Sequence, residues 1–481
     1  MARYHFERLS AESASHLLVE DSRHFAHALT VLVFERGELA RAERGVHLEE
    51  VARGIEARLH LAPRFRQRLK WVPYEDHPGW VDDAEFNLDY HVRHTALPHP
   101  GTETQLRRLA SRIMAQPLHR SRPLWECWVV EGLDKDRFAL IGKLHNCMVE
   151  GDSGADLFQA LLSSNPNEAF AAPPVFVARP SPSGLELVRD EVVRRFRLPQ
   201  KALARMRDLA SDPEALRYDF WRRVEGAARL LGYSVVPPRT TPINGRLGPH
   251  RRYHTLVLPF DRVQELHRRL DCTVHDVVLA TLCGALRRFF QERLVHPASL
   301  DLRVATPVQQ AADAGYDELG EWLIELPIWE SDPLKMIDSI REQTRDQNQA
   351  HPALGARTLF SMARWSGSRM LALSGRSLSH YAPVHTSLVN VPVSQQPLYF
   401  MGAKLLHAFG AVPLRGEQAV SVATISYDGK LCVGINADFD TVPDVDALGK
   451  AFERALADLG SASENATPKL RAIDGGVRGA S

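Results

Sequence analysis

The stretch Lys143-Leu144-His145-Asn146-Cys147-Met148-Val149-Glu150-Gly151-Asp152-Ser153-Gly154 joins two segments of different hydrophobic period. The residues before it, 137–142, have the short apolar run of a strand, and residues 155–162 have the spacing of a helix. Asp152 or Ser153 suits the N-cap of that helix, and Gly151 permits backbone angles that strain other residues. The strand–turn–helix order predicts an α/β domain with polar side chains at the turn.

Composition limits the class of protein. A chain of 481 residues suggests two domains of roughly 200 residues each. Lys plus Arg equals Asp plus Glu at 59 each, so net charge gives no reason to expect nucleic acid as a partner. Arginines are frequent between residues 187 and 252. They form either a solvated helical face or a patch for anionic lipid headgroups or the phosphates of an acyl carrier.

The cysteines and the hydropathy pattern indicate the cellular compartment in which the protein is expected. Five scattered cysteines without Cys-x-x-Cys spacing argue against a disulfide framework and a zinc site, and fit a reducing cytoplasm. The N-terminus lacks the apolar run of a signal peptide, and no apolar stretch reaches the ~18 residues that span a bilayer. We expect a cytoplasmic protein that is soluble or peripheral at the inner membrane or at lipid inclusions.

Pattern breaks divide the chain. Residues 27–35 and 136–146 have strand patterns, and residues 49–59 and 104–115 have helical spacing. Prolines interrupt residues 165–184, Arg-rich helices are predicted over 185–233, and a hairpin is predicted to turn at Asp428-Gly429. We therefore divide the chain into an N-terminal lobe, a Pro- and Arg-rich helical crossover, a C-terminal lobe and a disordered tail, at residues 1–163, 164–250, 251–460 and 461–481.

Several short motifs follow one another in a fixed order. They are Arg64-Phe65-Arg66-Gln67-Arg68-Leu69, Phe86-Asn87-Leu88-Asp89-Tyr90-His91-Val92, Pro123-Leu124-Trp125, Pro242-Ile243-Asn244-Gly245, His275-Asp276-Val277-Val278, Asn390-Val391-Pro392, Ser426-Tyr427-Asp428-Gly429 and Val442-Pro443-Asp444. Together with the stretch at 143–154, they resemble the bacterial wax ester synthase/diacylglycerol acyltransferase family over most of the chain.

The resemblance implies a fold and an activity. The fold would be that of the chloramphenicol acetyltransferase-like superfamily: two mixed α/β lobes with a central tunnel, joined by a helical crossover. Acyl-CoA would enter one side as a substrate, and a long-chain alcohol or diacylglycerol would enter the other. No cofactor and no metal are expected. The products would be wax esters or triacylglycerol, made at a membrane or lipid-inclusion surface.

The resemblance also places the catalytic turn, where this chain departs from the family. The family signature is His-His-x-x-x-Asp-Gly, and its second His is the general base. Here that position is Asn146, and Glu150 stands for the Asp ahead of Gly151. An amide has no useful basicity near neutral pH, and loss of a general base typically costs about 10²–10⁴ in rate. Asn146 can still orient a hydroxyl or donate to a developing oxyanion.

Two imidazoles are candidates to replace the base. If the strand stays regular, His145 points away from the place where the base must act, and only a bulge would turn it inward. His275 stands at an Asn position of the family, where it is either a helix-start residue or a substitute base.

Further positions are expected near the substrates. His27 lies where the family has a His on an early strand, and either lines the tunnel or is a satisfied, partly buried His. Trp125 is expected to pack in the core or next to the substrate, and Asn390 and Pro392 to shape a loop against the tunnel.

Two functions therefore stay open. One is an O-acyltransferase, weakened or adapted at its base. The other is a non-catalytic homologue that binds acyl chains, a partner acyltransferase or an inclusion surface. A specialised acyltransferase that uses an amine or a sugar alcohol shares the same expected fold.

Overall fold

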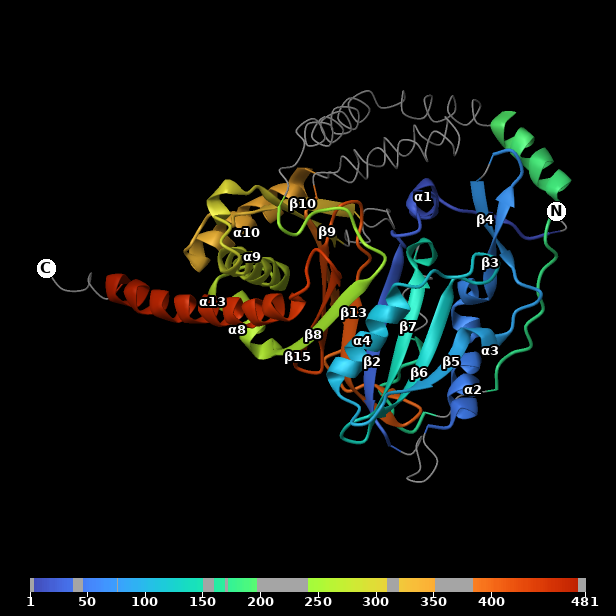
Figure 1. Ribbon diagram of the computed structural model, residues 1–481, viewed down its shortest axis with the longest axis horizontal. Coiled ribbons are helices and arrows are strands. Elements are labelled where there is room, and N and C mark those ends of the chain that lie inside the picture. The colour runs from blue at the N-terminus through green and yellow to red at the C-terminus, as the bar shows by residue number, and fades with distance from the viewer. Residues whose placement is uncertain are drawn as a thin grey trace, which may run out of the picture.

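The computed structural model describes residues 4–37, 46–75, 77–149, 160–168, 172–196, 241–308, 320–350 and 384–474. Two lobes lie side by side in Figure 1, and each is built on a six-stranded sheet. This confirms the predicted fold class of two mixed α/β lobes, whereas the tunnel between them stays a prediction.

The first lobe contains a mixed sheet in which the expected strands lie at the centre. In spatial order its strands are β12 (Tyr399–Phe400), β13 (Ala403–Ala411), β2 (His27–Glu35), β7 (Arg137–His145), β6 (Trp125–Leu133) and β5 (Val92–Ala96). Every residue of β7 is buried, because β2 and β6 flank it and side chains pack on both faces. The remaining elements are α1 (Ala11–Val19), α2 (Leu48–Arg58), η1 (Leu59–Leu61), η2 (Pro63–Arg66), α3 (Leu88–His91), α4 (Glu103–Met114) and η3 (Asn146–Met148).

The helices predicted at 49–59 and 104–115 form within a residue of the expected ranges, as α2 and α4. The helix predicted at 155–162, with its N-cap at Asp152 or Ser153, lies outside the described residues except at its end. Thr102 starts α4 with a capping box: its hydroxyl accepts the Gln105 backbone N–H, and the Gln105 side chain accepts the Thr102 N–H. Helix α4 packs against β2 and β7 of its own lobe and also against β8 (Arg251–Pro259) of the second lobe. It therefore lies where the two lobes meet.

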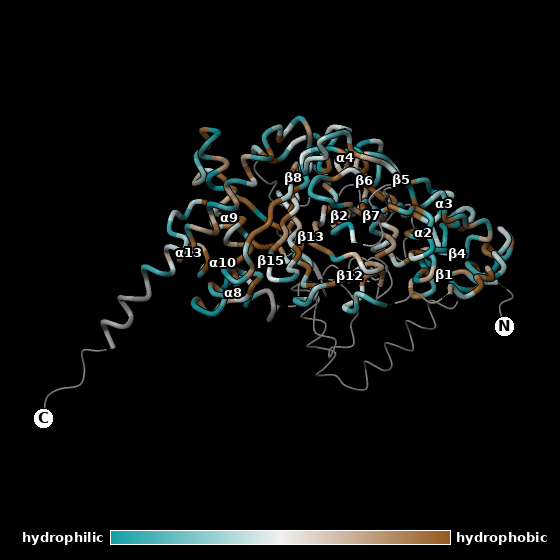
Figure 2. Tube along the Cα trace, turned by 90° about the horizontal axis from the view of Figure 1, so that it is seen from below, coloured by the Kyte–Doolittle hydropathy of each residue, from teal (hydrophilic) through white to brown (hydrophobic). Residues whose placement is uncertain are grey.

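The second lobe follows the same plan. Its sheet has the order β10 (Gly320–Leu326), β9 (Leu302–Val308), β11 (Thr386–Pro392), β14 (Val420–Tyr427), β15 (Lys430–Asp438) and β8. Its helical elements are α8 (Phe260–Arg269), α9 (Val274–Glu292), η5 (Pro297–Ser299), α10 (Pro333–Ala350) and α13 (Val445–Asp474). Apolar residues gather on inner strands such as β15, while α8 is largely hydrophilic (Figure 2). The predicted hairpin is confirmed: Asp428 and Gly429 take φ of 45° and 71°, as a tight hairpin turn requires.

The division into lobes by sequence is wrong in one respect. Strands β12 and β13, which we assigned to the C-terminal lobe at 251–460, pair with the sheet of the first lobe, with β13 antiparallel to β2. Phe400, Leu405 and Phe409 belong to the core of that lobe. The second half of the chain therefore completes the first sheet, which fixes the lobes to each other.

The crossover and the C-terminus differ partly from expectation. Residues 172–183 have no regular structure, as the prolines predict, and residues 184–196 are helical. Arg179 in this segment makes a bidentate ion pair with Asp82 at 2.7 and 2.8 Å. The rest of the predicted helices, 197–233, lies outside the described residues. The tail predicted from residue 461 is wrong as far as Asp474, because α13 continues through it.

A small three-stranded sheet lies beside the first lobe. Its order is β1 (Glu7–Arg8), β4 (His77–Asp82) and β3 (Gln67–Val72). Arg8 joins it to the crossover by pairing with Glu75 at 2.6 Å and with Glu191 at 2.8 Å. Among the described residues, no helix combines the length and low polarity that crossing a bilayer requires.

Candidate active site

The predicted catalytic turn begins where β7 ends. His145 is the last residue of β7, and Asn146 opens the short turn η3. The Asn146 backbone N–H donates to the Ala26 carbonyl at 2.8 Å, which ties the turn to the start of β2. The strand stays regular to its end, with His145 directly opposite His27 on β2, so no bulge turns His145 towards the Asn146 position.

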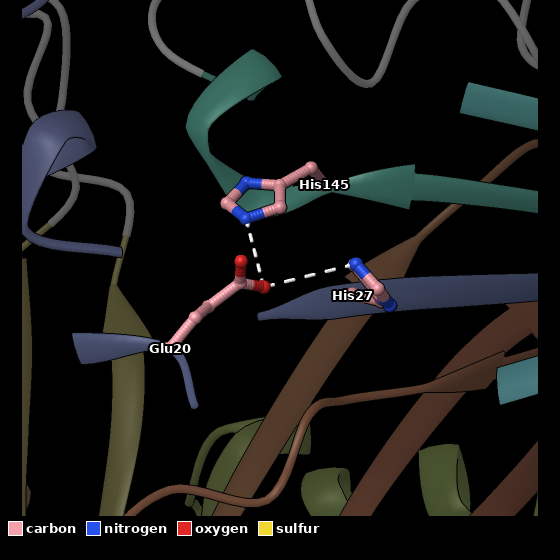
Figure 3. Close-up of side chains that lie close together, drawn as sticks. All are labelled: Glu20, His27 and His145. Atoms are coloured by element: carbon pink, nitrogen blue, oxygen red, sulfur yellow. Dashed lines mark ion pairs between the residues drawn. The ribbon is translucent and has the colours of Figure 1, made fainter. Parts of the chain in front are cut away.

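Glu20, just after α1, brings these two histidines together (Figure 3). Its Oε1 lies 3.0 Å from His145 Nε2 and 3.7 Å from His27 Nε2. The same oxygen accepts the Ala26 N–H at 2.8 Å, and Oε2 accepts from the Arg120 guanidinium at 2.7 Å. One carboxylate thus connects α1, the start of β2, the end of β7 and the loop before β6.

The charges of this cluster depend on its burial. Burial alone would raise the pKa of Glu20, but His145, His27 and Arg120 outweigh it and lower that pKa to about 2. His27 is 2 % exposed, and its burial, reinforced by Lys143 and His145, lowers its pKa well below the ordinary 6.5. At neutral pH the cluster therefore holds an ionised carboxylate and a neutral His27.

Hydrogen bonds to the backbone decide which imidazole nitrogen is free. His145 Nδ1 accepts the Cys147 N–H at 3.1 Å, so the proton of a neutral His145 is on Nε2, facing Glu20. That contact is too bent for a good hydrogen bond and is mainly electrostatic. Among the described residues, the buried Nδ1 of His27 has no hydrogen-bond partner. Its Nε2 faces Glu20 at 3.7 Å, beyond hydrogen-bond distance.

The three side chains are of types that bind metal ions, and their ligand atoms lie within 4.8 Å of one another. A metal ion at His145 Nε2 would need a lone pair on that atom. Nδ1 already uses its lone pair for the Cys147 N–H, and a neutral imidazole cannot have both nitrogens unprotonated. Among the described residues, this cluster therefore does not fit a metal centre.

A cavity of about 140 Å³ opens beside the cluster. Glu20, His27 and His145 line it together with the apolar side chains of Phe25, Leu118 and Leu124. Its described lining comes entirely from the first lobe. Asp21, Pro117 and Arg120 complete the lining, so the cavity has ionisable and apolar side chains side by side.

Comparisons with known proteins identify the family. The model of the wax ester synthase/diacylglycerol acyltransferase catalytic domain matches residues 9–278, and the model of the C-terminal domain of the same family matches residues 318–460. This chain belongs to the wax ester synthase/diacylglycerol acyltransferase family. The predicted enzyme class, an acyltransferase, is thereby confirmed.

Individual relatives agree with the family models. A probable diacylglycerol O-acyltransferase of Mycobacterium tuberculosis (strain CDC 1551 / Oshkosh) is 31 % identical over 468 residues, covering 94 % of this chain and 95 % of the relative. A putative diacylglycerol O-acyltransferase of M. tuberculosis (strain ATCC 25618 / H37Rv) is 33 % identical over 427 residues, covering 85 % and 82 %.

Solved structures support the fold. The wax ester synthase/diacylglycerol acyltransferase from Marinobacter aquaeolei VT8 superposes with a TM-score of 0.68 at 21 % identity, covering 95 % of this chain and 100 % of that one. The first condensation domain of the CDA synthetase gives a TM-score of 0.57 at 15 % identity, covering 96 % and 97 %. At such identities the likeness concerns the two-lobed architecture alone.

The other residues predicted for the family's site are spread over both lobes. Trp125 is fully buried: its indole N–H donates to the Phe65 carbonyl at 2.8 Å, and its ring stacks on His91 with centroids 4.6 Å apart. It packs in the core, and the described cavity lining does not include it. Glu150 and Gly151 lie outside the described residues.

The remaining candidates lie in the second lobe. His275 lies in the first turn of α9, where its Nε2 contacts the Thr306 hydroxyl at 3.3 Å and its ring meets Trp322 edge-on. Asn390 on β11 accepts from the Thr424 hydroxyl at 2.9 Å, and Pro392 is the exposed last residue of that strand. The structure does not bring these three residues to the cavity beside His145.

Sequence reasoning missed Glu20. It follows an ordinary amphipathic helix, and nothing in Leu17-Leu18-Val19-Glu20 indicates a special carboxylate. Its importance comes from contacts with residues about a hundred positions away, Arg120 and His145. Only the pairing of β2 with β7 would have indicated that His27 and His145 share a carboxylate.

Proposed function

We propose that this chain transfers a fatty acyl group from acyl-CoA to the hydroxyl of diacylglycerol or of a long-chain alcohol. The observation that carries the proposal is the match of both family domains along the chain, with relatives named as diacylglycerol O-acyltransferases over nearly its full length. The products would be triacylglycerol or a wax ester, and acyl-CoA would be a substrate with no other cofactor.

The chemistry needs a base close to the acceptor hydroxyl, since an alcohol attacks a thioester poorly while it keeps its proton. Asn146 stands at the family's base position and cannot take that proton. Its amide remains available to orient the acceptor or to donate to the oxyanion as the thioester carbonyl is attacked. The Asn146 backbone N–H bonds to the Ala26 carbonyl, which supports this proposal by fixing the main chain of the turn from which the amide would act.

A second candidate function is a non-catalytic homologue that binds acyl chains or a partner acyltransferase. Two observations favour it: position 146 lacks an imidazole, and His145 Nδ1 already accepts the Cys147 N–H. An amine or a sugar alcohol as acceptor remains a third form of the same activity.

The acceptors are lipids, so we also propose that the protein works at a membrane or inclusion surface. The crossover helix at 184–196 supports this proposal. Leu185 and Phe196 are 85 % and 77 % exposed on it, next to several arginines. An apolar face flanked by arginines is the pattern of helices that lie in a lipid interface.

The test is the release of free CoA from palmitoyl-CoA, with dioleoylglycerol or hexadecanol as acceptor and the lipid product identified by mass spectrometry. The proposal expects triacylglycerol or wax ester in amounts equal to the CoA released. CoA release without a lipid ester would indicate thioester hydrolysis. Binding of palmitoyl-CoA without any release would favour the non-catalytic homologue.

A further inference from the structure

The loop at residues 20–26 carries the anchor of the predicted catalytic turn. It connects α1 to β2, and the Ala26 carbonyl accepts the Asn146 backbone N–H at 2.8 Å. Glu20 holds the loop from the side of the first lobe, since it accepts the Ala26 N–H at 2.8 Å and the Arg120 guanidinium at 2.7 Å. The position of the 20–26 loop therefore sets the position of the main chain at Asn146.

The second lobe holds the same loop through Arg251, the first residue of β8. Its Nη2 donates to the Arg23 carbonyl at 2.5 Å, while Nη1 donates to the Gly248 and His250 carbonyls at 2.7 and 2.9 Å. The Arg251 side chain is only 6 % exposed, so water competes little for these bonds. One guanidinium thus connects β8 of the second lobe to the loop that precedes β2 of the first.

A buried carboxylate fixes Arg251 in turn. Asp438, the last residue of β15, has no exposed surface and lies 3.7 Å from Nη1 of Arg251. Asp438 also accepts the Gly248 N–H at 2.7 Å and the Thr441 hydroxyl at 3.0 Å, so the second lobe sets its orientation. Burial lowers the pKa of Arg251, whereas Asp438 and Asp21 oppose this, and a guanidinium stays charged at neutral pH.

His24 gives the 20–26 loop another contact with the second half of the chain. Its Nε2 lies 3.0 Å from the Gly416 carbonyl oxygen, and its Nδ1 lies 2.9 Å from the Asp21 carboxylate of the same loop. Gly416 belongs to the connection from β13 to β14, where the chain passes from the first sheet to the second. The loop is therefore gripped at Arg23 and at His24 from outside its own lobe.

We infer that Arg251 is a positioning residue for the catalytic turn: it holds the 20–26 loop, and the loop holds the main chain of Asn146. The inference rests on the proposed acyl transfer, in which the Asn146 amide orients the acceptor or donates to the oxyanion. Catalysis is sensitive to small displacements, and a misplacement of about 1 Å can cost about 10²-fold in rate. A single side chain of the second lobe thereby controls the geometry of a turn in the first.

The experiment compares wild type with Arg251→Gln. Arg107→Gln is the matched control: Arg107 on α4 also contacts the other lobe, at 2.9 Å from His254 Nδ1, and none of its described contacts is with the 20–26 loop. The first measurement is hydrogen exchange of the Asn146 amide, resolved to the single residue by mass spectrometry with peptide fragmentation. The second is the separate determination of kcat and of KM for palmitoyl-CoA.

Both measurements have an expected size. The Asn146 amide of Arg251→Gln should exchange roughly 10–100-fold faster than in wild type, because a hydrogen bond from a charged group to the loop is lost. Its kcat should fall about 10–100-fold while KM changes little, since Arg251 places the turn and does not bind substrate. Arg107→Gln should match wild type in both. A general loosening of the lobe contact would affect the two variants alike.

A second variant covers the case in which Arg251→Gln does not fold, which thermal unfolding will show. His24→Ala removes the contact of the loop with Gly416, and the His24 side chain is 19 % exposed, so its loss leaves the buried core intact. Faster exchange of the Asn146 amide in His24→Ala than in Arg107→Gln is the expected result.

The outcomes separate this inference from the proposed function. A folded Arg251→Gln whose Asn146 amide exchanges within about threefold of wild type overturns the inference, even if kcat falls. The same result in His24→Ala overturns it if Arg251→Gln is unfolded, and so does an equal change in Arg107→Gln. Exchange needs no turnover, so if wild type transfers no acyl group the proposed function fails, while faster exchange still supports the link from Arg251 to the turn.

Discussion

Replacing Glu20 by Gln keeps the shape of the side chain and removes its charge. The pKa of Glu20 falls from the ordinary 4.5 to about 2 because His145, His27 and Arg120 stabilise the carboxylate. Each pKa unit corresponds to about 1.4 kcal/mol, so the ionised Glu20 adds at most about 3 kcal/mol to the free energy of unfolding. At neutral pH, where His27 is neutral, the guanidinium of Arg120 remains as a charged partner. Its side chain is only 8 % exposed, so solvent screens these contacts weakly.

The sign of the pH dependence follows from the lowered pKa. A carboxylate that is more acidic in the folded state stabilises the protein fully above the unfolded pKa, and this stabilisation is lost as the pH falls from 4.5 towards 2. The free energy of unfolding of Glu20→Gln should therefore be lower than that of wild type by up to about 3 kcal/mol at pH 7, and by about half of that deficit at pH 3.

The assay is urea unfolding followed by tryptophan fluorescence, for wild type and Glu20→Gln at both pH values. Glu85→Gln is the control, because Glu85 is exposed and such substitutions usually stay within about 0.5 kcal/mol. A deficit that is the same at pH 7 and pH 3, or one no larger than that of Glu85→Gln at pH 7, would refute the reasoning.

Three further predictions concern packing and location. Gly434→Ala should destabilise the contact between the lobes, since an added Cβ would lie 2.0 Å from the Gly410 carbonyl oxygen; a lower Tm than wild type checks this. Trp125→Ala should cost about 3–5 kcal/mol by leaving a cavity in the core, measurable as a lowered urea midpoint, and an effect below 1 kcal/mol would contradict the packing. Leu185→Asp with Phe196→Asp should weaken flotation with anionic liposomes without lowering Tm, because both side chains are exposed; unchanged flotation would exclude this helix as the lipid contact.

Local sequence patterns predicted the individual helices and strands, but not which strands pair with each other. The alternation of residues 27–35, the helical spacing of 104–115 and the Asp428-Gly429 turn each depend on neighbours in the sequence, and all three form as predicted. Strand β13 also has an ordinary strand pattern. Its pairing with β2 depends on the return of the chain to the first lobe, which hydrophobic period does not encode.

The candidate site was likewise predicted only in part from the sequence. The sequence predicted the turn after β7 and the face on which His145 lies, because both follow from the period of a strand. The state of each imidazole could not be predicted. It depends on the Cys147 N–H, which occupies His145, and on Glu20, which faces His27 from another element. His27 was expected to be either satisfied or tunnel-lining; it lines the cavity beside Glu20, and its buried Nδ1 has no partner among the described residues.

The most direct measurement is the initial rate of CoA release from palmitoyl-CoA with dioleoylglycerol, for wild type and for Asn146→His. If this chain is an active acyltransferase, wild type turns over without an imidazole at position 146, and its lipid product matches the CoA released. If only Asn146→His turns over, the scaffold is intact but the natural chain has lost its catalyst, which would contradict the proposed acyl transfer.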